Sequence, residues 1–478
     1  RVRRRGRQLT NRGCTDAANG ERLVRAFGQD TRFAFHRKKW FVWDGRRWAL
    51  DETAVIERYA TRVARDILRE AADVGSAEEQ KALTNWARQS QMGPRIDAMI
   101  KAARPLVPLK ADETDRDPAL LNAANGTIDL RTGELRPHER SDFITKVLPI
   151  PYDPTAEAPR WLEFLRQITG GSDQLIGYLQ RMAGYVATGE TREQCLFLLH
   201  GSGANGKSTF IEALLSTLGG DFARPTDFRT LLYRDRGDGV RNDLAALHSV
   251  RLVTAVEVAP ERRLDEALVK QLTGGDTITA RFLYGEYFDF TPKFKLLLAA
   301  NHRPVIRGVD EGIWRRIRLV PFEVTIPPKL RDRKLPAVLL TELPGILAWI
   351  VAGAMAWYDT GLCEPEEVTR ATTSYREESD ALADFLEACA EIGADVALPV
   401  AMLYFAYEGW VAESGNDPWK KDTFAKAIAA RGHVSEPKRV NGKTQRVYPK
   451  LLLSPEGRRL AAETRRRRDI HDDPNSSF

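Results

Sequence analysis

A glycine-rich stretch near the middle of the chain limits the fold more than any other part of the sequence. Residues 195–209 read Cys-Leu-Phe-Leu-Leu-His-Gly-Ser-Gly-Ala-Asn-Gly-Lys-Ser-Thr, and an amphipathic run follows them. The spacing from Gly201 to Ser208 is that of a Walker A loop, Gly-x4-Gly-Lys-Ser. Glycines let backbone N–H groups converge on phosphate oxygens, and the next helix turns its positive end toward them. The stretch therefore predicts a strand, a phosphate-binding turn and a helix.

This loop predicts roles for individual side chains. Lys207 can reach the β- and γ-phosphates of ATP, and the Ser208 hydroxyl can hold Mg²⁺. A chance match in a glycine-containing turn is the alternative, which the apolar flanks disfavour. The residues expected to bind the nucleotide are Gly201, Gly203, Ala204, Asn205, Gly206, Lys207, Ser208 and Thr209.

Two further apolar runs end on polar side chains. The run at residues 250–258 carries Glu257, which suits a buried strand that delivers a carboxylate next to Mg²⁺. The run at residues 293–301 ends on Asn301, whose amide can orient the attacking water or sense the γ-phosphate. An incidental glutamate at a strand end is the alternative for Glu257, and Val256 stands where a paired acid would precede it.

The flanking segments predict additional domains. Residues 15–75 combine a helix with aromatic-rich strands around an Asp44-Gly45 turn, with basic residues between the aromatic ones. Such a sheet either stacks single-stranded nucleic acid or packs its tryptophans inward, and inward packing is favoured. Residues 366–391 are expected to form one long helix. Beyond residue 400, two helices and a basic hairpin at Asn441-Gly442 favour a winged-helix-like domain that touches DNA, with a protein-protein or capping domain as the alternative.

Charge and composition narrow the classes of function. The 478-residue chain has a net charge of +6, and nine arginines lie within residues 1–7 and 465–468. Terminal basic runs suit nucleic-acid backbones, although they also occur as solvated tails. The four cysteines lie far apart, which argues against a zinc ribbon or a disulfide framework. This cysteine usage suits a reducing cytoplasm, and we expect that of a bacterial or phage-infected host cell. No apolar run predicts a membrane span, and residues 339–357 are expected to be a buried helix.

The order and spacing of these motifs resemble those of the superfamily III helicases. The resemblance is closer to the helicase half of the phage/plasmid and poxvirus-type primase-helicases. It is strong over residues 175–325 and extends over residues 15–460. The matching motifs are residues 201–209, Glu257, Lys-Gln-Leu-Thr-Gly-Gly-Asp-Thr-Ile-Thr-Ala-Arg at 270–281, Asn-His-Arg-Pro at 301–304 and Trp-Arg-Arg at 314–316.

The resemblance implies an α/β, AAA+-like ring helicase, usually a homo-hexamer, with ATP and Mg²⁺ held between neighbouring subunits. By position, Lys207 and Ser208 would bind nucleotide and metal, Glu257 would be the Walker B acid and metal ligand, and Asn301 a sensor. Arg315 or Arg316 would be the arginine finger that reaches a neighbouring subunit. Internal salt bridges are the alternative for these two arginines. A hairpin at residues 276–295 would line the pore, where Arg281, Lys293 or Lys295 would contact DNA. The alternative for some of these three is an ordinary place in a strand.

We expect a P-loop core flanked by smaller domains. Because no room for a polymerase domain remains before residue 15, we expect any primase domain to lie upstream in a longer protein or to be missing. The predicted function is an ATP-dependent DNA helicase of phage or plasmid-type replication. The alternatives are an ATP-switched initiator or loader and a packaging-type ATPase. The predicted segments are a basic tail 1–14, an α+β region 15–118, a helical collar 119–194, the core 195–325, a helical continuation 326–392, a winged-helix-like domain 393–460 and a basic tail 461–478.

Overall fold

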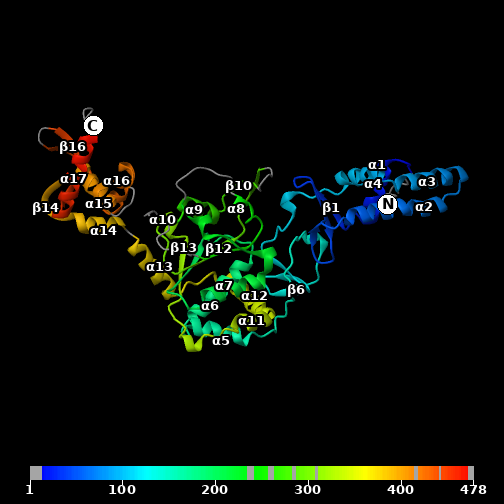
Figure 1. Cartoon of the computed structure of the whole chain (residues 1–478), viewed down its shortest axis with the longest axis horizontal. Helices are drawn as coiled ribbons and strands as arrows, with labels where there is room; N and C mark the ends of the chain where they lie inside the picture. Colours follow the sequence, from blue (N-terminus) through cyan, green and yellow to red (C-terminus); the bar gives the residue numbers. More distant parts are fainter. Residues whose placement is uncertain are drawn as a thin grey trace, which may run out of the picture.

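The computed structural model describes residues 13–233, 242–256, 263–281, 287–306, 311–379, 381–413, 418–440 and 443–471. A helical N-terminal domain and a small C-terminal domain lie at opposite ends of a central α/β body (Figure 1). The arginines within residues 1–7 and the predicted turn at residues 441–442 lie outside the described residues.

The N-terminal domain packs four helices beside a small antiparallel sheet of order β1-β2-β3. The Asp51 carboxylate accepts hydrogen bonds from the first-turn amides of Val55 and Ile56, each at 2.9 Å, and so begins the longest helix of the domain. Trp40 and Trp48 are buried, so the expected inward packing of the tryptophans is confirmed. The elements are α1 (Asp16–Phe27), β1 (Thr31–Ala34), β2 (Lys39–Trp43), β3 (Trp48–Leu50), α2 (Val55–Ala72), α3 (Ala77–Ser90) and α4 (Gly93–Ala103).

A second small sheet and two helices connect this domain to the central body. The strands pair antiparallel in the order β4-β5-β6. The two helices bury aromatic and aliphatic side chains in the core of the central body. The elements are β4 (Leu120–Ala123), β5 (Gly126–Asp129), β6 (Glu134–Arg136), α5 (Pro159–Ile168) and α6 (Asp173–Ala187).

The central body is built on a parallel sheet with the strand order β13-β7-β12-β9-β8. Its inner strands read as continuous apolar runs because both faces of the sheet are covered. Insertion of β12 between β7 and β9 pairs His200 with Ala300, which brings the residues that follow these two strands to the same edge of the sheet. The strands are β7 (Leu196–His200), β8 (Ala223–Pro225), β9 (Leu252–Val256), β12 (Lys295–Ala300) and β13 (Ile317–Pro321).

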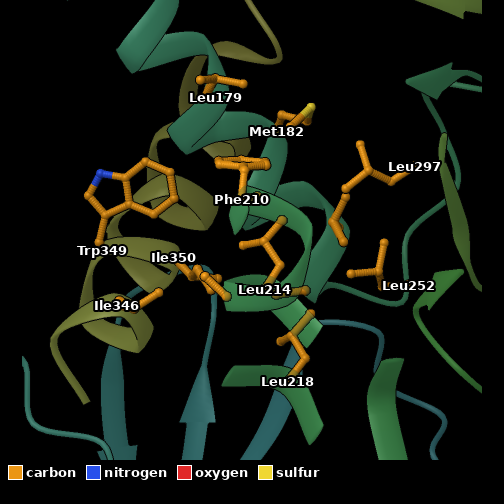
Figure 2. Packing of buried hydrophobic residues seen from close by; sticks show 14 of the residues in the cluster. Leu179, Met182, Phe210, Leu214, Leu218, Leu252, Leu297, Ile346, Trp349 and Ile350 are labelled. Carbon is orange, nitrogen blue, oxygen red and sulfur yellow. The ribbon is translucent and has the colours of Figure 1, made fainter. Parts of the chain in front are cut away.

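Helices cover both faces of this sheet. On one face, Phe210, Leu214 and Leu218 of α7 pack between the sheet and the helices α6 and α12 (Figure 2). Each such buried side chain contributes roughly 1.5–3 kcal/mol, so α7 is held firmly against the strand that precedes it. The remaining elements of the body are α7 (Lys207–Phe222), α8 (Asn242–Ala245), α9 (Glu266–Gly274), β10 (Ile278–Arg281), β11 (Tyr287–Phe290), α10 (Glu311–Trp314), α11 (Leu335–Thr341) and α12 (Leu343–Thr360).

The apolar segment at residues 339–357 falls within α11 and α12, and most of α12 is buried in the body as expected. Among the described residues, no single helix has the length and apolar character needed to cross a bilayer. One pair, Pro328–Thr341 with Leu343–Thr360, has sufficient length and hydropathy together but is bent by 78°.

The C-terminal part differs from the sequence prediction in two places. The single helix expected at residues 366–391 is wrong, because α13 (Glu366–Glu378) and α14 (Ala381–Cys389) are separate and the chain then enters β14 (Ala390–Pro399). The basic tail expected from residue 461 is also wrong as far as His471, because the arginines lie on a helix, α17, on which Arg468 pairs with Glu408 at 2.5 Å. The expected hairpin is present in a sheet of order β14-β16-β15. The remaining elements are α15 (Val400–Glu413), α16 (Lys421–Ala430), β15 (Glu436–Val440), β16 (Lys443–Leu453) and α17 (Pro455–His471).

Candidate nucleotide site

The glycine-rich loop joins β7 to α7, as predicted. Gly203 and Gly206 have φ values of +102° and +85°, which side chains other than glycine rarely adopt. A Cβ at Gly201 would lie 2.2 Å from the Phe322 carbonyl oxygen, and one at Gly206 would lie 2.5 Å from Ile168 Cγ2. The conformation therefore requires glycine at these points, and the loop ends where the first turn of α7 presents its free N–H groups.

Lys207 is the central side chain of the loop. Although only 5% of its surface is exposed, its ammonium donates hydrogen bonds to Gly201 O at 2.6 Å, Asn205 Oδ1 at 3.1 Å and Asn301 Oδ1 at 3.1 Å. Burial lowers the pKa of Lys207. These acceptors are uncharged, so an anionic phosphate at the loop would be a stronger partner for the ammonium than any of them.

Asn301 directly follows β12, at the same edge of the sheet as the loop. Its amide oxygen contacts Lys207, although 94 residues separate the two in the chain. The structure thus brings together the two residues that were singled out separately from sequence. The roles assigned to them stay predictions.

Ser208 lies on the first turn of α7 and lines a cavity of about 770 Å³. Thr254, Ala255 and Val256, at the carboxyl end of β9, line the same cavity. Glu257 comes next in the chain but lies outside the described residues, so its position remains a prediction. The described residues contain no group of three His, Cys, Asp or Glu side chains suited to a metal. A Mg²⁺ bound chiefly through nucleotide phosphates needs only one or two protein oxygens, and the Ser208 hydroxyl fits that requirement.

The two candidate finger arginines have different environments. Arg316 is 8% exposed and donates from Nε to Thr273 Oγ1 at 3.1 Å and from Nη1 to Gly312 O at 2.6 Å. Arg315 precedes it and is exposed. Only Arg315 is therefore placed to reach another molecule, whereas Arg316 anchors the residues after α10.

The segment after Asn301 is held by α13, a contact that no local sequence pattern indicated. Arg303 pairs with Glu378, and the Tyr375 hydroxyl donates to the Pro304 carbonyl. Burial, followed by the charges of Arg303 and Lys207, lowers the pKa of His200 to about 4, so this imidazole is neutral near pH 7. Helix α13, which leads to the C-terminal domain, thus packs against the segment next to the candidate site.

The predicted DNA-contacting residues fall into different environments. Arg281, at the end of β10, lies over the Tyr287 ring at 4.9 Å on the opposite strand of an antiparallel hairpin. Lys293 is exposed and donates to Asp115 O at 2.9 Å. The prediction for Lys295 is wrong, because this side chain is 2% exposed and its ammonium donates to the backbone carbonyls of residues 188 and 190. Residues 282–286, the tip of the predicted pore hairpin, lie outside the described residues.

Three sequence families match separate parts of the chain. Residues 20–170 match the family described as D5 N terminal like. Residues 199–316 match a family of unknown function, DUF5906. Residues 377–451 match the family described as poxvirus D5 protein-like.

Curated relatives come from large DNA viruses. The protein named "Putative helicase L207/L206" of Acanthamoeba polyphaga mimivirus is 30% identical over 296 residues, which cover 57% of this chain and 30% of that protein. "Putative helicase 184R" of Invertebrate iridescent virus 6 is 29% identical over 270 residues, covering 53% and 27%. "Primase D5" of Fowlpox virus (strain NVSL) is 27% identical over 138 residues, covering 28% and 17%. The matches thus span less than a third of the length of each relative.

Among solved structures, the apo NrS-1 C terminal region aligns with a TM-score of 0.49 at 12% identity, covering 87% of this chain and 95% of that one.

Proposed function

We propose that this chain, which carries the D5 N-terminal and poxvirus D5-type domains of the primase-helicase family, is the helicase half of a replication protein and uses ATP hydrolysis to unwind DNA. The observation that carries the proposal is the contact of Lys207 Nζ with both the glycine-rich loop and Asn301 Oδ1. It supports the proposal because an ammonium that can bind phosphate and an amide that can orient water lie together at the carboxyl edge of a parallel sheet.

In this proposal the loop amides and Lys207 hold the phosphates of ATP, and the Ser208 hydroxyl and Glu257 hold Mg²⁺. When bound, Mg²⁺ would neutralise charge on the phosphate oxygens. Asn301 would orient the attacking water, since its amide lies beside the Lys207 ammonium at 3.1 Å. The neutral His200 adds no charge to this edge near pH 7.

We further propose an AAA+-like ring in which Arg315 serves as the finger in a neighbouring subunit. Its exposure supports this choice over the buried Arg316. A homo-hexamer would place the β10–β11 hairpin around DNA, with Arg281 and Lys293 near the strand. The basic β15–β16 hairpin of the C-terminal domain would contact DNA backbone as a wing does. A primase domain elsewhere in a longer protein would complete the replication function.

Strand separation on a forked duplex tests this proposal. The wild-type chain should separate the strands with Mg²⁺-ATP but not with a non-hydrolysable analogue. Lys207→Ala should abolish separation and hydrolysis, while Lys334→Ala, at an exposed lysine outside the loop sequence, should not. DNA binding with no hydrolysis-dependent separation would instead support an ATP-switched initiator or loader, and separation by Lys207→Ala would refute the proposal.

A further inference from the structure

The turn between β1 and β2 exposes an aromatic ring and basic side chains side by side. Phe35 is 52% exposed, whereas Phe33 and Trp40 in the flanking strands are buried. The next four residues, 36–39, are His-Arg-Lys-Lys and are all exposed. A single exposed aromatic residue is ordinary on a protein surface, but its position directly beside three basic side chains is not explained by packing.

The turn has a defined backbone conformation. Arg37 N donates to Ala34 O and Lys38 N donates to Phe35 O, each at 3.2 Å, and Lys38 has a φ of 54°. The Phe35 ring meets the Phe33 ring edge-on, with centroids 4.9 Å apart. The Phe35 ring is thus held by a packing contact while much of its surface remains accessible.

The basic side chains of this turn have no acidic partner within the part of the chain that the structure describes. Elsewhere in the same domain arginines are paired, as in Arg22–Glu70 at 2.9 Å and Arg95–Asp16 at 2.6 Å. Three neighbouring unpaired cations repel one another, so the turn gains stability from any polyanion that binds there.

The turn lies near the hairpin of the central body. The β1–β3 sheet is tied to that body through Arg47, which pairs with Asp221 at the end of α7. Arg37 is close enough to His248 for its charge to be the second cause, after burial, of the lowered pKa of that imidazole. The His248 ring in turn packs edge-on against Phe288 and Phe290 of β11, with centroids 5.4 and 5.5 Å away.

We propose that the β1–β2 turn binds single-stranded DNA, with Phe35 stacked on a base and Arg37, Lys38 and Lys39 against successive phosphates. An aromatic platform flanked by cations is the arrangement that binds single strands without sequence preference. The bound DNA would then continue to the β10–β11 hairpin, and this continuation rests on the proposed function. Binding of DNA at the turn itself does not.

Equilibrium binding of a fluorescent 30-nucleotide oligo-dT, measured without ATP over a range of salt concentrations, tests the inference. Replacing Arg37, Lys38 and Lys39 together with Ala should make the slope of log affinity against log salt shallower by about two, since each phosphate contact on a single strand contributes about 0.7. A matched control removes three exposed basic residues from α2 and α3 of the same domain, Arg65, Lys81 and Arg88, and should leave the slope within about half a unit of wild type.

The stacking contact has its own test. Phe35→Ala should weaken oligo-dT binding by about fivefold or more with an unchanged salt slope, and Phe35→Tyr should bind as wild type. Circular dichroism melting verifies that each variant is folded. Equal slopes for the turn and control triple variants would overturn the inference. If those slopes are equal while ATP hydrolysis responds to DNA, the inference fails and the proposed function stands. If the turn variant has the shallower slope but the wild-type chain never hydrolyses ATP, the proposed function fails and the inference stands.

Discussion

The contact between Asn301 and Lys207 allows binding of nucleotide to be separated from hydrolysis by two substitutions at one position. Asn301→Ala removes one of three acceptors of the Lys207 ammonium and leaves Gly201 O and Asn205 Oδ1 in place. The loop should therefore keep its shape, and the dissociation constant for ATP should change less than about threefold. If the amide positions the attacking water, kcat should fall on the order of 10²–10³, as for the loss of one preorganised polar group in other active sites.

Asn301→Asp should have a different effect. It would place a carboxylate where the amide oxygen now lies 3.1 Å from Lys207 Nζ. At an effective dielectric constant near 20, that attraction is roughly 5 kcal/mol before solvent screening, and the exposure of residue 301 reduces it. Even about 1.4 kcal/mol of competition for the ammonium weakens nucleotide binding tenfold, so we expect a dissociation constant at least about tenfold higher than in wild type.

Fluorescent-nucleotide titration and single-turnover hydrolysis measure the two effects separately. His302→Ala, at the exposed neighbouring position, is the control and should leave both quantities near wild type. A wild-type kcat in Asn301→Ala would refute the sensor role. Equal nucleotide affinity in the Ala and Asp variants would show that Lys207 does not exchange its amide partner for phosphate.

Other substitutions test the arginines, the loop conformation and the buried histidine. Arg315→Ala should lower hydrolysis on the order of 10³ with an unchanged melting temperature, whereas Arg316→Ala should lower the melting temperature, because only Arg316 is buried and bonded internally; the reverse pattern would contradict the assignment. Gly206→Ala should lower the free energy of unfolding by about 2 kcal/mol or more, since the φ of +85° and a Cβ contact of 2.5 Å are both unfavourable; an unchanged denaturant midpoint would refute this. Burial, followed by nearby positive charges, lowers the pKa of His248 to about 4, so the folded state binds fewer protons than the unfolded state between pH 4 and about 6.5. The free energy of unfolding should therefore be highest above about pH 6.5 and fall as the pH drops through that window. In urea titrations, His248→Gln should make this fall smaller by about 1–2 kcal/mol. An equal fall in the wild type and in His248→Gln would contradict the prediction.

Local patterns were sufficient to predict the strand, loop and helix around Lys207. The apolar run of β7, the glycine spacing and the amphipathic α7 are all encoded by consecutive residues, and the structure confirms their order. The contact with Asn301 was also within reach, because a polar residue after a buried parallel strand lies at the carboxyl edge of the sheet.

Other features depend on packing that sequence patterns do not encode. Lys293 and Lys295 flank one phenylalanine in the same apolar run, and only the tertiary structure places the second ammonium among buried backbone carbonyls. The pairing of Arg303 with Glu378 joins residues 75 positions apart and leaves no local signal. The strand β14 was missed because its sequence, Ala-Glu-Ile-Gly-Ala-Asp-Val-Ala-Leu-Pro, lacks regular alternation, and its pairing with β16 determines its conformation.

The proposed function depends on hydrolysis of ATP at the loop around Lys207 in response to DNA. The most direct test is the steady-state hydrolysis rate of the wild-type, Lys207→Ala and Lys334→Ala chains, each with and without single-stranded DNA. We expect hydrolysis that DNA stimulates in the wild type and in Lys334→Ala, and none in Lys207→Ala. Equal hydrolysis by wild type and Lys207→Ala, or a wild-type rate that DNA does not change, would contradict it.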